Sequence, residues 1–181
     1  MDSDALIASL QQAIPGVHCE PAPSVDLHAT VYVSRDDLPA VAPALKHHPD
    51  LQFGLLAELT AVDFWPREPR YEVVYVLVSL ARRARLRMKV RLNADDAHVA
   101  TVSEVWPAAN WLEREVWDLF GIAFDRHPDP RRLLMPEDWD GYPLRKDYPV
   151  QIRKHANASE PLQVTQEEFR RNVERDRLTR T

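Results

Sequence analysis

The sequence predicts an α/β (α+β) fold, in which a mainly antiparallel sheet of about four strands packs against helices and a proline-rich extended arm follows. Residues 84–92 alternate apolar and basic side chains with a period of two, which is typical of a strand. Residues 107–120 repeat apolar side chains at helical spacing. Prolines recur between 122 and 150 and exclude long regular structure there: Pro128, Pro130, Pro136, Pro143 and Pro149.

The composition is that of a globular protein with no sign of nucleic-acid chemistry. The chain has 181 residues, of which 45% are hydrophobic and 28% charged, with a formal net charge of −5. One domain with a real core is therefore expected, and the mild acidity gives no reason to expect nucleic acid as a partner. Cys19 is the single cysteine, so the chain cannot form an internal disulfide or supply the roughly four thiolates of an iron–sulfur cluster.

The same numbers bear on compartment and membrane. A single cysteine favours a reducing compartment. The start, Met1–Asp4, is acidic, whereas a signal or transit peptide starts basic. The longest apolar run, Val73–Ala81, is far shorter than the roughly 20 residues that span a bilayer. We therefore expect no membrane span, although the chain can still dock on a membrane protein.

The first half of the chain predicts helices and strands in turn. Apolar spacing predicts helices over 3–14 and about 37–47, and strands over 25–33, 51–64, 71–80 and 84–92. Strand 71–80 is apolar on both faces, as a central strand is. Its short connection to 84–92 predicts an antiparallel hairpin.

Two further helices are expected before the arm. Asp95 or Asp96 can cap a helix that runs to about Val105. The next helix begins near Pro107, since proline is favoured in a first turn, and Gly121 is well placed as its C-terminal cap.

The chain divides into three parts on this interpretation. Residues 1–121 form an α+β core domain, residues 122–150 an irregular arm, and residues 151–181 a polar tail with a short helix over about 165–177. The arm is too apolar to be disordered. Because ordered irregular backbone needs hydrogen-bonding partners, we expect many of them on another protein.

A basic stripe on strand 84–92 has two interpretations. Arg85, Arg87, Lys89 and Arg91 face one way. They could bind phosphates or an acidic partner, or they could form the solvated face of an outer strand. The solvated face is favoured, because simple alternation produces such stripes.

The carboxylates of helix 107–120 suggest acid–base catalysis, but their spacing opposes it. Glu113 and Glu115 point about 200° apart on a helix, so they cannot share one substrate. Glu115 and Asp118 do share a face, which leaves a stand-alone hydrolase open as a remote alternative. Arg114 and Asp118 are four apart and could pair. Glu115 is expected to pair with basic residues of the arm or of a partner. No catalytic residue is predicted.

Other kinds of site find little support. His127 lacks metal-ligand partners at a recognisable spacing, so we expect no metal site and a hydrogen bond to a nearby carboxylate or carbonyl. The only glycines are Gly16, Gly54, Gly121 and Gly141, which excludes a glycine-rich nucleotide loop. Arginines beside aromatic residues in the arm are typical of a subunit interface.

Residues 113–149 match a family signature in register. The match runs through Glu113, Arg114, Glu115, Asp118, Leu119, Phe120, Gly121, His127, Pro128, Arg131, Arg132, Leu133, Arg145, Lys146, Asp147 and Tyr148. In this pattern the chain resembles the C subunit family of NADH:quinone oxidoreductase (respiratory complex I, NDH-1). Residues 51–92 match more loosely. Pro130 stands where the family commonly has leucine, so we expect a local change in backbone path there.

The resemblance implies a structural, cofactor-free subunit of the peripheral arm of a larger enzyme. FMN and iron–sulfur clusters would lie on partner subunits, chiefly the D subunit, which is like the hydrogenase large subunit, and the B and I iron–sulfur subunits. The whole enzyme passes electrons from NADH to quinone and pumps protons. The resemblance also implies a peripheral location on the cytoplasmic side of the bacterial inner membrane. Equivalent subunits of membrane-bound hydrogenases or coenzyme F420-dependent dehydrogenases share the signature and remain alternatives.

Overall fold

The computed structural model describes residues 3–26, 28–149, Glu167 and Arg171. One compact unit spans Met1–Tyr148, and a second spans Pro149–Thr181. Residues 122–148 of the arm therefore belong to the same compact unit as the core. The helix predicted over 165–177 lies outside the described residues, except for Glu167 and Arg171, which are helical.

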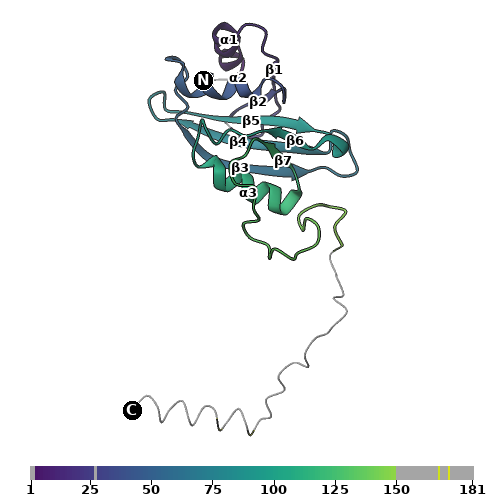
Figure 1. Cartoon of the computed structure of the whole chain (residues 1–181). Coiled ribbons are helices and arrows are strands. Elements are labelled where there is room, and N and C mark those ends of the chain that lie inside the picture. Colours follow the sequence, from purple (N-terminus) through teal and green to yellow (C-terminus); the bar gives the residue numbers. More distant parts are fainter. Residues whose placement is uncertain (1–2, 27, 150–166, 168–170, 172–181) are drawn as a thin grey trace, which may run out of the picture. The chain divides into compact units, whose positions relative to one another are not determined.

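A five-stranded sheet forms the centre of the first unit (Figure 1). Its strands are β1 (Cys19–Pro21), β2 (Ala29–Val33), β3 (Leu55–Asp63), β4 (Tyr71–Ser79) and β5 (Ala84–Leu92), in the order β1-β2-β5-β4-β3. All neighbours are antiparallel except β2 and β5, which are parallel. The predicted hairpin of β4 and β5 is confirmed. The fifth strand, β1, was not predicted, because three residues are too few to show a strand pattern.

The basic stripe lies on the middle strand of this sheet, not on an outer one. β5 sits between β2 and β4, so the expectation of an outer strand is wrong. The stripe still forms a polar face. Arg87 pairs with Asp26 at 2.6 Å, Lys89 pairs with Glu72 at 2.9 Å, and Arg85 and Arg91 are exposed. The alternate residues of β5, such as Met88 and Val90, are fully buried on the opposite face.

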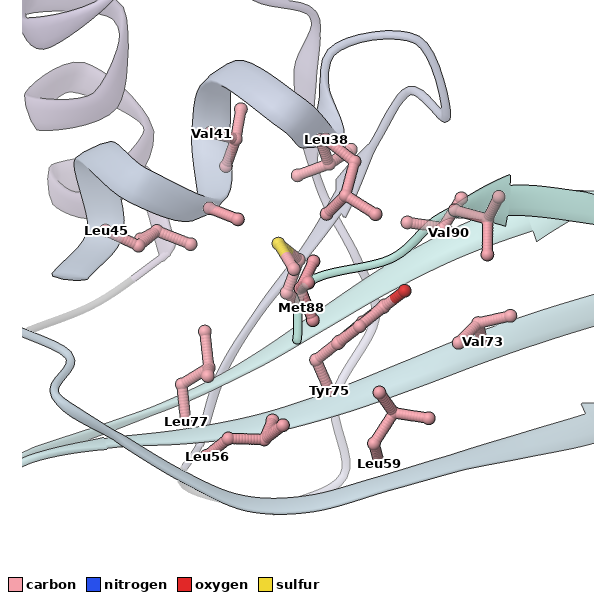
Figure 2. Packing of buried hydrophobic residues seen from close by; sticks show 14 of the residues in the cluster. Leu38, Val41, Leu45, Leu56, Leu59, Val73, Tyr75, Leu77, Met88 and Val90 are labelled. Atoms are coloured by element: carbon pink, nitrogen blue, oxygen red, sulfur yellow. The ribbon is translucent and has the colours of Figure 1, made fainter. Parts of the chain in front are cut away.

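Helices cover that buried face and close the core. They are α1 (Ser3–Ala13), α2 (Leu38–His47) and α3 (Ala109–Phe120). Figure 2 shows Leu38, Val41 and Leu45 of α2 above Met88 and Tyr75 of the sheet. α3 packs against β3 at the far side of the same core. This two-layer arrangement is what an apolar stripe on a helix and an apolar face on a sheet require.

The helix predicted from Asp95 to Val105 is wrong. The chain forms instead a short 3-10 turn, η1 (Ala94–Asp96), and a strand, β6 (His98–Ala100), which pairs in parallel with β7 (Ala123–Asp125). Asp96 does not cap a helix, because its carboxylate binds Arg35 and His98. The strand pair fixes the two ends of the segment that carries α3. Over the described residues, the structure has no helix long and apolar enough to cross a membrane.

Candidate functional site

Helix α3 positions the signature residues, and the arm folds back against it. The helix presents Ala109, Val116 and Phe120 to the core. It ends at Gly121, whose φ of +73° is the left-handed cap conformation that glycine favours. The predicted cap is confirmed. A β-carbon at Gly121 would also overlap the Arg145 guanidinium and the Tyr142 ring, so glycine is needed there for close approach as well.

Asp118 is the anchor of the arm. Its side chain is fully buried. One carboxylate oxygen accepts the backbone N–H groups of Leu133, Leu134 and Met135 at 2.7–3.0 Å, and the other accepts Arg132 at 2.7 Å. Burial alone would raise the pKa of Asp118, but these donors outweigh it and hold the pKa below its usual value. The ionised carboxylate therefore orders the turn at 132–135.

Three arginines satisfy the carbonyl groups of the arm and of the end of the helix. Arg114 donates to the carbonyls of Arg131 and Arg132 and pairs with Asp129 at 3.3 Å. Arg132 reaches the carbonyls of residues 139 and 141, and Arg145 donates to those of residues 120 and 121. The suggested pairing of Arg114 with Asp118 is wrong, because each residue binds these other partners. A planar guanidinium with five donors suits this task, which a lysine could not perform.

Glu113 and His127 form a second buried contact beneath the arm. The Glu113 side chain is completely enclosed, and its carboxylate accepts the N–H of Val102 at 2.7 Å and the hydroxyl of Thr101. Burial raises the pKa of Glu113 to about 7, and the two donors only partly oppose this. His127 lies 3.7 Å from the carboxylate, donates from Nε2 to the carbonyl of Asn110, and accepts the N–H of Asp129 at Nδ1. The expected hydrogen bond from His127 to a carbonyl is confirmed.

Asp63, Arg70 and Asp147 form a clamp at the far end of the arm, which the sequence did not predict as a site. Asp63, at the end of β3, binds Arg70 through both oxygens at 2.9–3.0 Å and accepts the N–H of Lys146 at 2.8 Å. Arg70 in turn binds both oxygens of Asp147. Burial acts to raise the pKa of Asp63, yet Arg70 and the backbone donors lower it to about 2. The alternation of β3, which turns Asp63 towards the buried face, was the signal that could have revealed it.

The remaining signature residues divide between this network and the surface. Tyr148 packs its ring against Gly141 and donates to the carbonyl of Asp140. Arg131 pairs with Asp129 on the surface. Lys146 contributes its backbone N–H to the clamp. Glu115 is half-buried, and its carboxylate has no ion pair or hydrogen bond among the described residues, so it does not pair with the described arm; pairing with a partner stays a prediction.

This network fixes the path of the arm's backbone, but its carboxylates and hollows are poorly suited to binding a substrate. Both oxygens of Asp118 are occupied and enclosed, so a Glu115–Asp118 pair cannot work as an acid–base dyad. The hollow beside Glu113 and His127 measures about 100 Å³, well below the roughly 300–1,000 Å³ of ligand pockets. No group of three or more potential metal ligands occurs within the part of the chain that the structure describes.

Comparisons with known proteins agree with the signature. The family described as respiratory-chain NADH dehydrogenase, 30-kDa subunit, matches residues 31–154. The C subunit of NADH-quinone oxidoreductase from Geobacter sulfurreducens is 50% identical over 123 residues, which cover 67% of this chain and 75% of that protein. The protein of the same name from Roseiflexus castenholzii is 42% identical over 151 residues, 83% of this chain and 86% of the relative. The Saccharopolyspora erythraea relative is 48% identical over 122 residues, which span only 49% of its length.

Two solved structures share the fold. The trypsin-resistant fragment of Nqo5 has a TM-score of 0.57 and 30% identity, covering 71% of this chain and 99% of the fragment. A chain of the membrane-bound sulfane sulfur reductase, an archaeal respiratory membrane complex, has a TM-score of 0.67 and 26% identity, covering 81% and 85%. The family match spans both β3 and the whole arm network described above. The chain therefore belongs to the family of the 30-kDa subunit of respiratory-chain NADH dehydrogenase.

Proposed function

We propose that the chain is a non-catalytic, cofactor-free subunit of the peripheral arm of a proton-pumping NADH:quinone oxidoreductase. The observation that carries this proposal is the set of groups to which the signature carboxylates are hydrogen-bonded. Glu113 and Asp118 bind the chain's own backbone and arginines, and they shape the arm instead of facing a substrate. Signature residues that fix the backbone path of a surface segment are what a subunit needs if that segment is to pack against other subunits.

The arm carries the features of an interface. Leu134 and Leu144 stand exposed on it, and Trp111 stands exposed on α3 beside Arg114. Exposed apolar residues next to arginine are enriched where proteins meet. We propose that this surface contacts the D subunit, the partner that is like the hydrogenase large subunit, with the B and I iron–sulfur subunits nearby. FMN and the clusters would reside on partner subunits, and quinone reduction would occur there.

The proposed location follows from the proposed partners. The chain would lie peripherally on the cytoplasmic side of the bacterial inner membrane, held by the other subunits. In this position it supports assembly of the quinone-reducing module. Electrons pass from NADH through FMN and the clusters to quinone, and no step of this transfer takes place on the chain itself.

Affinity purification of the tagged full chain from native membranes tests this proposal. We expect the quinone-reducing subunits to co-purify, together with NADH:quinone oxidoreductase activity. An Asp118→Asn variant, which loosens the arm, should reduce the recovery of partner subunits, whereas a Glu104→Gln variant, at an exposed position outside the arm, should not. Recovery of the chain alone, free of any quinone-reductase or hydrogenase subunit, would contradict the proposal.

A second candidate is the equivalent subunit of a related membrane complex. The archaeal sulfane sulfur reductase chain has the higher TM-score of the two structures, 0.67 against 0.57, which favours keeping this candidate. The relatives at 42–50% identity carry the NADH-quinone oxidoreductase name, which favours the first. The co-purified subunits and the electron donor that they accept, NADH or another, distinguish the two.

A further inference from the structure

Helices cover only one of the two faces of the five-stranded sheet. Tyr75, Leu77 and Met88 point from that face towards α2 (Figure 2). The core on this side takes buried residues from α1, α2 and α3 alike. Because successive strand residues point to opposite faces, Val74 and Val76 of β4 point the other way, and neither belongs to this core. In the described part of the chain, the opposite face, called here the outer face, therefore has no helix packed on it.

The register of strand pairing shows which side chains share the outer face. β4 supplies an apolar column, which continues just past the strand: Val74, Val76, Val78 and Leu80. β5 supplies the basic stripe beside this column, with Arg85 opposite Val78 and Arg91 opposite Glu72. β3 supplies the other side: Leu55, Glu58, Thr60 and Val62. The outer face thus has an apolar centre with arginine and lysine along one side.

Exposed apolar side chains gather on the outer face. Four of them are 37–79% exposed: Leu55, Val62, Phe64 and Leu80. Phe64 continues the alternation of β3, since its N–H donates to the carbonyl of Arg70 at the end of the β3–β4 ladder. Between the two ends of the face, Val76 and Val78 are half-buried. Scattered apolar residues are normal on a surface, whereas a contiguous row of them indicates a place where another molecule packs.

Two arginines at the ends of the basic stripe lack an acidic partner. Arg85 and Arg91 are exposed and form no ion pair within the described residues, and the Arg91 guanidinium lies 3.4 Å from the centroid of the Tyr32 ring. Their separation along β5 corresponds to about 20 Å. The whole chain carries a net charge of −5, so these cations are not part of a generally basic surface. A segment that is both apolar and acidic is complementary to such a face.

We propose that the outer face binds an amphipathic helix of another subunit of the complex. The apolar stripe of this helix packs on Val76, Val78 and the exposed apolar residues beside them, and its aspartate or glutamate residues pair with Arg85 and Arg91. A helix fits this face better than an added strand does, because sheets bury their faces against a second layer and because α3 already packs along β3. At 1.5 Å per residue, acids about 13 residues apart on the helix would reach both arginines.

The inference rests on the proposed function, because it needs a partner subunit. It concerns a surface distinct from the arm surface of Trp111, Leu134 and Leu144. Of the two interpretations of the basic stripe, the unpaired arginines and the apolar row beside them favour an acidic partner over a solvated face.

Cysteine labelling of the full chain, alone and within the purified complex, tests the proposal. In a Cys19→Ser background, Glu58→Cys places a thiol in the middle of the outer face, and Gln12→Cys places one on the exposed side of α1. In the complex we expect a maleimide to react with Glu58→Cys at least about tenfold more slowly than in the isolated chain, and with Gln12→Cys at a similar rate, since reaction requires an accessible thiol. Unchanged reaction at Glu58→Cys in an intact complex would overturn the inference and leave the proposed function standing.

A photo-cross-linker attached to the same thiol identifies the occupant of the outer face. We expect a cross-link to another subunit, in a segment whose apolar residues recur every three to four positions and which carries aspartate or glutamate. A cross-link to a second copy of this chain, to the chain's own residues after Tyr148, or to a segment without acidic residues would overturn the inference.

Charge variants provide the second arm of the experiment. Arg85→Gln combined with Arg91→Gln should lower the affinity for the partner subunits by about tenfold. Gln11→Glu combined with Gln12→Glu makes the same change of net charge on the exposed side of α1 and should leave the affinity unaltered. Equal effects of the two double variants would overturn the inference, because net charge alone would then explain them.

Arg85→Gln alone guards this test against a loss of folding. Arg91 contacts Tyr32, so the double variant can lose stability, whereas Arg85 forms no ion pair or hydrogen bond within the described chain. The single variant should unfold at the same urea midpoint as the parent and bind the partner subunits about threefold more weakly. Unaltered affinity would overturn the inference. A chain that co-purifies with no partner would refute the proposed function, and the inference with it.

Discussion

Glu113 and Glu115 lie two residues apart on helix α3, and their surroundings differ in every respect. Glu113 is completely enclosed, bonded to Val102 and Thr101, and its pKa is raised to about 7 by burial. Glu115 is half-buried beside an apolar hollow, and its carboxylate has no hydrogen bond or ion pair with any described residue. The two carboxylates of the helix thus differ in role: Glu113 holds neighbouring backbone in place, whereas the carboxylate of Glu115 makes no polar contact within the described chain.

This difference teaches how a signature of charged residues should be interpreted. Paired carboxylates in a short motif suggest catalysis, yet here the enclosed ones, Glu113 and Asp118, order the backbone around them. The carboxylate of Glu115, in contrast, contributes no hydrogen bond or ion pair to the described part of the chain. Removing an inner charge should therefore damage the folded chain itself, and removing the outer charge should damage only its assembly.

Asp118→Asn should produce the largest effect on the inner side. The substitution leaves the partly buried Arg132 without its counter-charge and replaces an acceptor of three N–H groups, itself fully buried, by an amide. Breaking a buried pair in this way costs about 3–5 kcal/mol. Urea denaturation of the full chain measures the loss, and Glu137→Gln, at an exposed position, should change it by less than about 0.5 kcal/mol. Equal stability of the two variants would remove Asp118 from its role as the anchor.

Glu113→Gln should alter how stability depends on pH. The raised pKa means that the folded chain holds a proton up to about pH 7, while the unfolded chain loses it near 4.5. Below 4.5 both states are protonated and Glu113 adds no penalty. Between 4.5 and 7 rising pH should cost about 3–4 kcal/mol, since one pKa unit corresponds to about 1.4 kcal/mol.

The glutamine resembles the protonated acid in shape and hydrogen bonding, so the variant should lack this loss and be the more stable form at pH 8. Chemical denaturation at pH 4.5, 6 and 8 measures it for both chains. A variant that loses stability with pH as steeply as the parent would show that another group titrates in this window.

Three glycine substitutions should separate backbone strain from close approach. Gly121→Ala combines a φ of +73° with overlap of Arg145 and Tyr142, and should cost about 2 kcal/mol or more. Gly16→Ala has a φ of +91° but open space, so about 1 kcal/mol is expected. Gly54→Ala meets neither obstacle and should fall within about 0.5 kcal/mol of neutral. Thermal or urea denaturation ranks the three, and a Gly121→Ala cost no larger than that of Gly16→Ala would mean that Arg145 moves aside freely.

The parts of the fold that follow from local periodicity could be predicted from the sequence. The β4–β5 hairpin, α2 and the cap at Gly121 all appear in the pattern of apolar residues and glycines. The region from Asp95 to Val105 could not be predicted, because β6 forms only where β7, beyond α3 in the chain, supplies a partner. A long-range pairing of two three-residue strands leaves almost no local signal.

The candidate site shows the same limit. The spacing of Glu113 and Glu115 correctly placed them on opposite sides of a helix. It could not indicate which of the two is enclosed, because β3, the arm and residues 101–102 decide that together. The clamp of Asp63, Arg70 and Asp147 includes an ion pair between residues 77 positions apart, and the identity of those partners depends on the folded sheet.

Glu115→Gln should have the smallest effect on the chain and provides the sharpest test of the comparison. A buried, paired Glu115 would cost about 3–5 kcal/mol to neutralise. Because Glu115 is half-buried and unpaired within the described chain, we expect a change below about 0.5 kcal/mol in urea denaturation. On the proposed function, recovery of partner subunits with the same variant should nevertheless fall, because a basic residue of a partner would lose its counter-charge. A variant that loses several kcal/mol in the isolated chain would place Glu115 with Glu113 among the residues that build the fold, and the distinction between the two sides of α3 would fail.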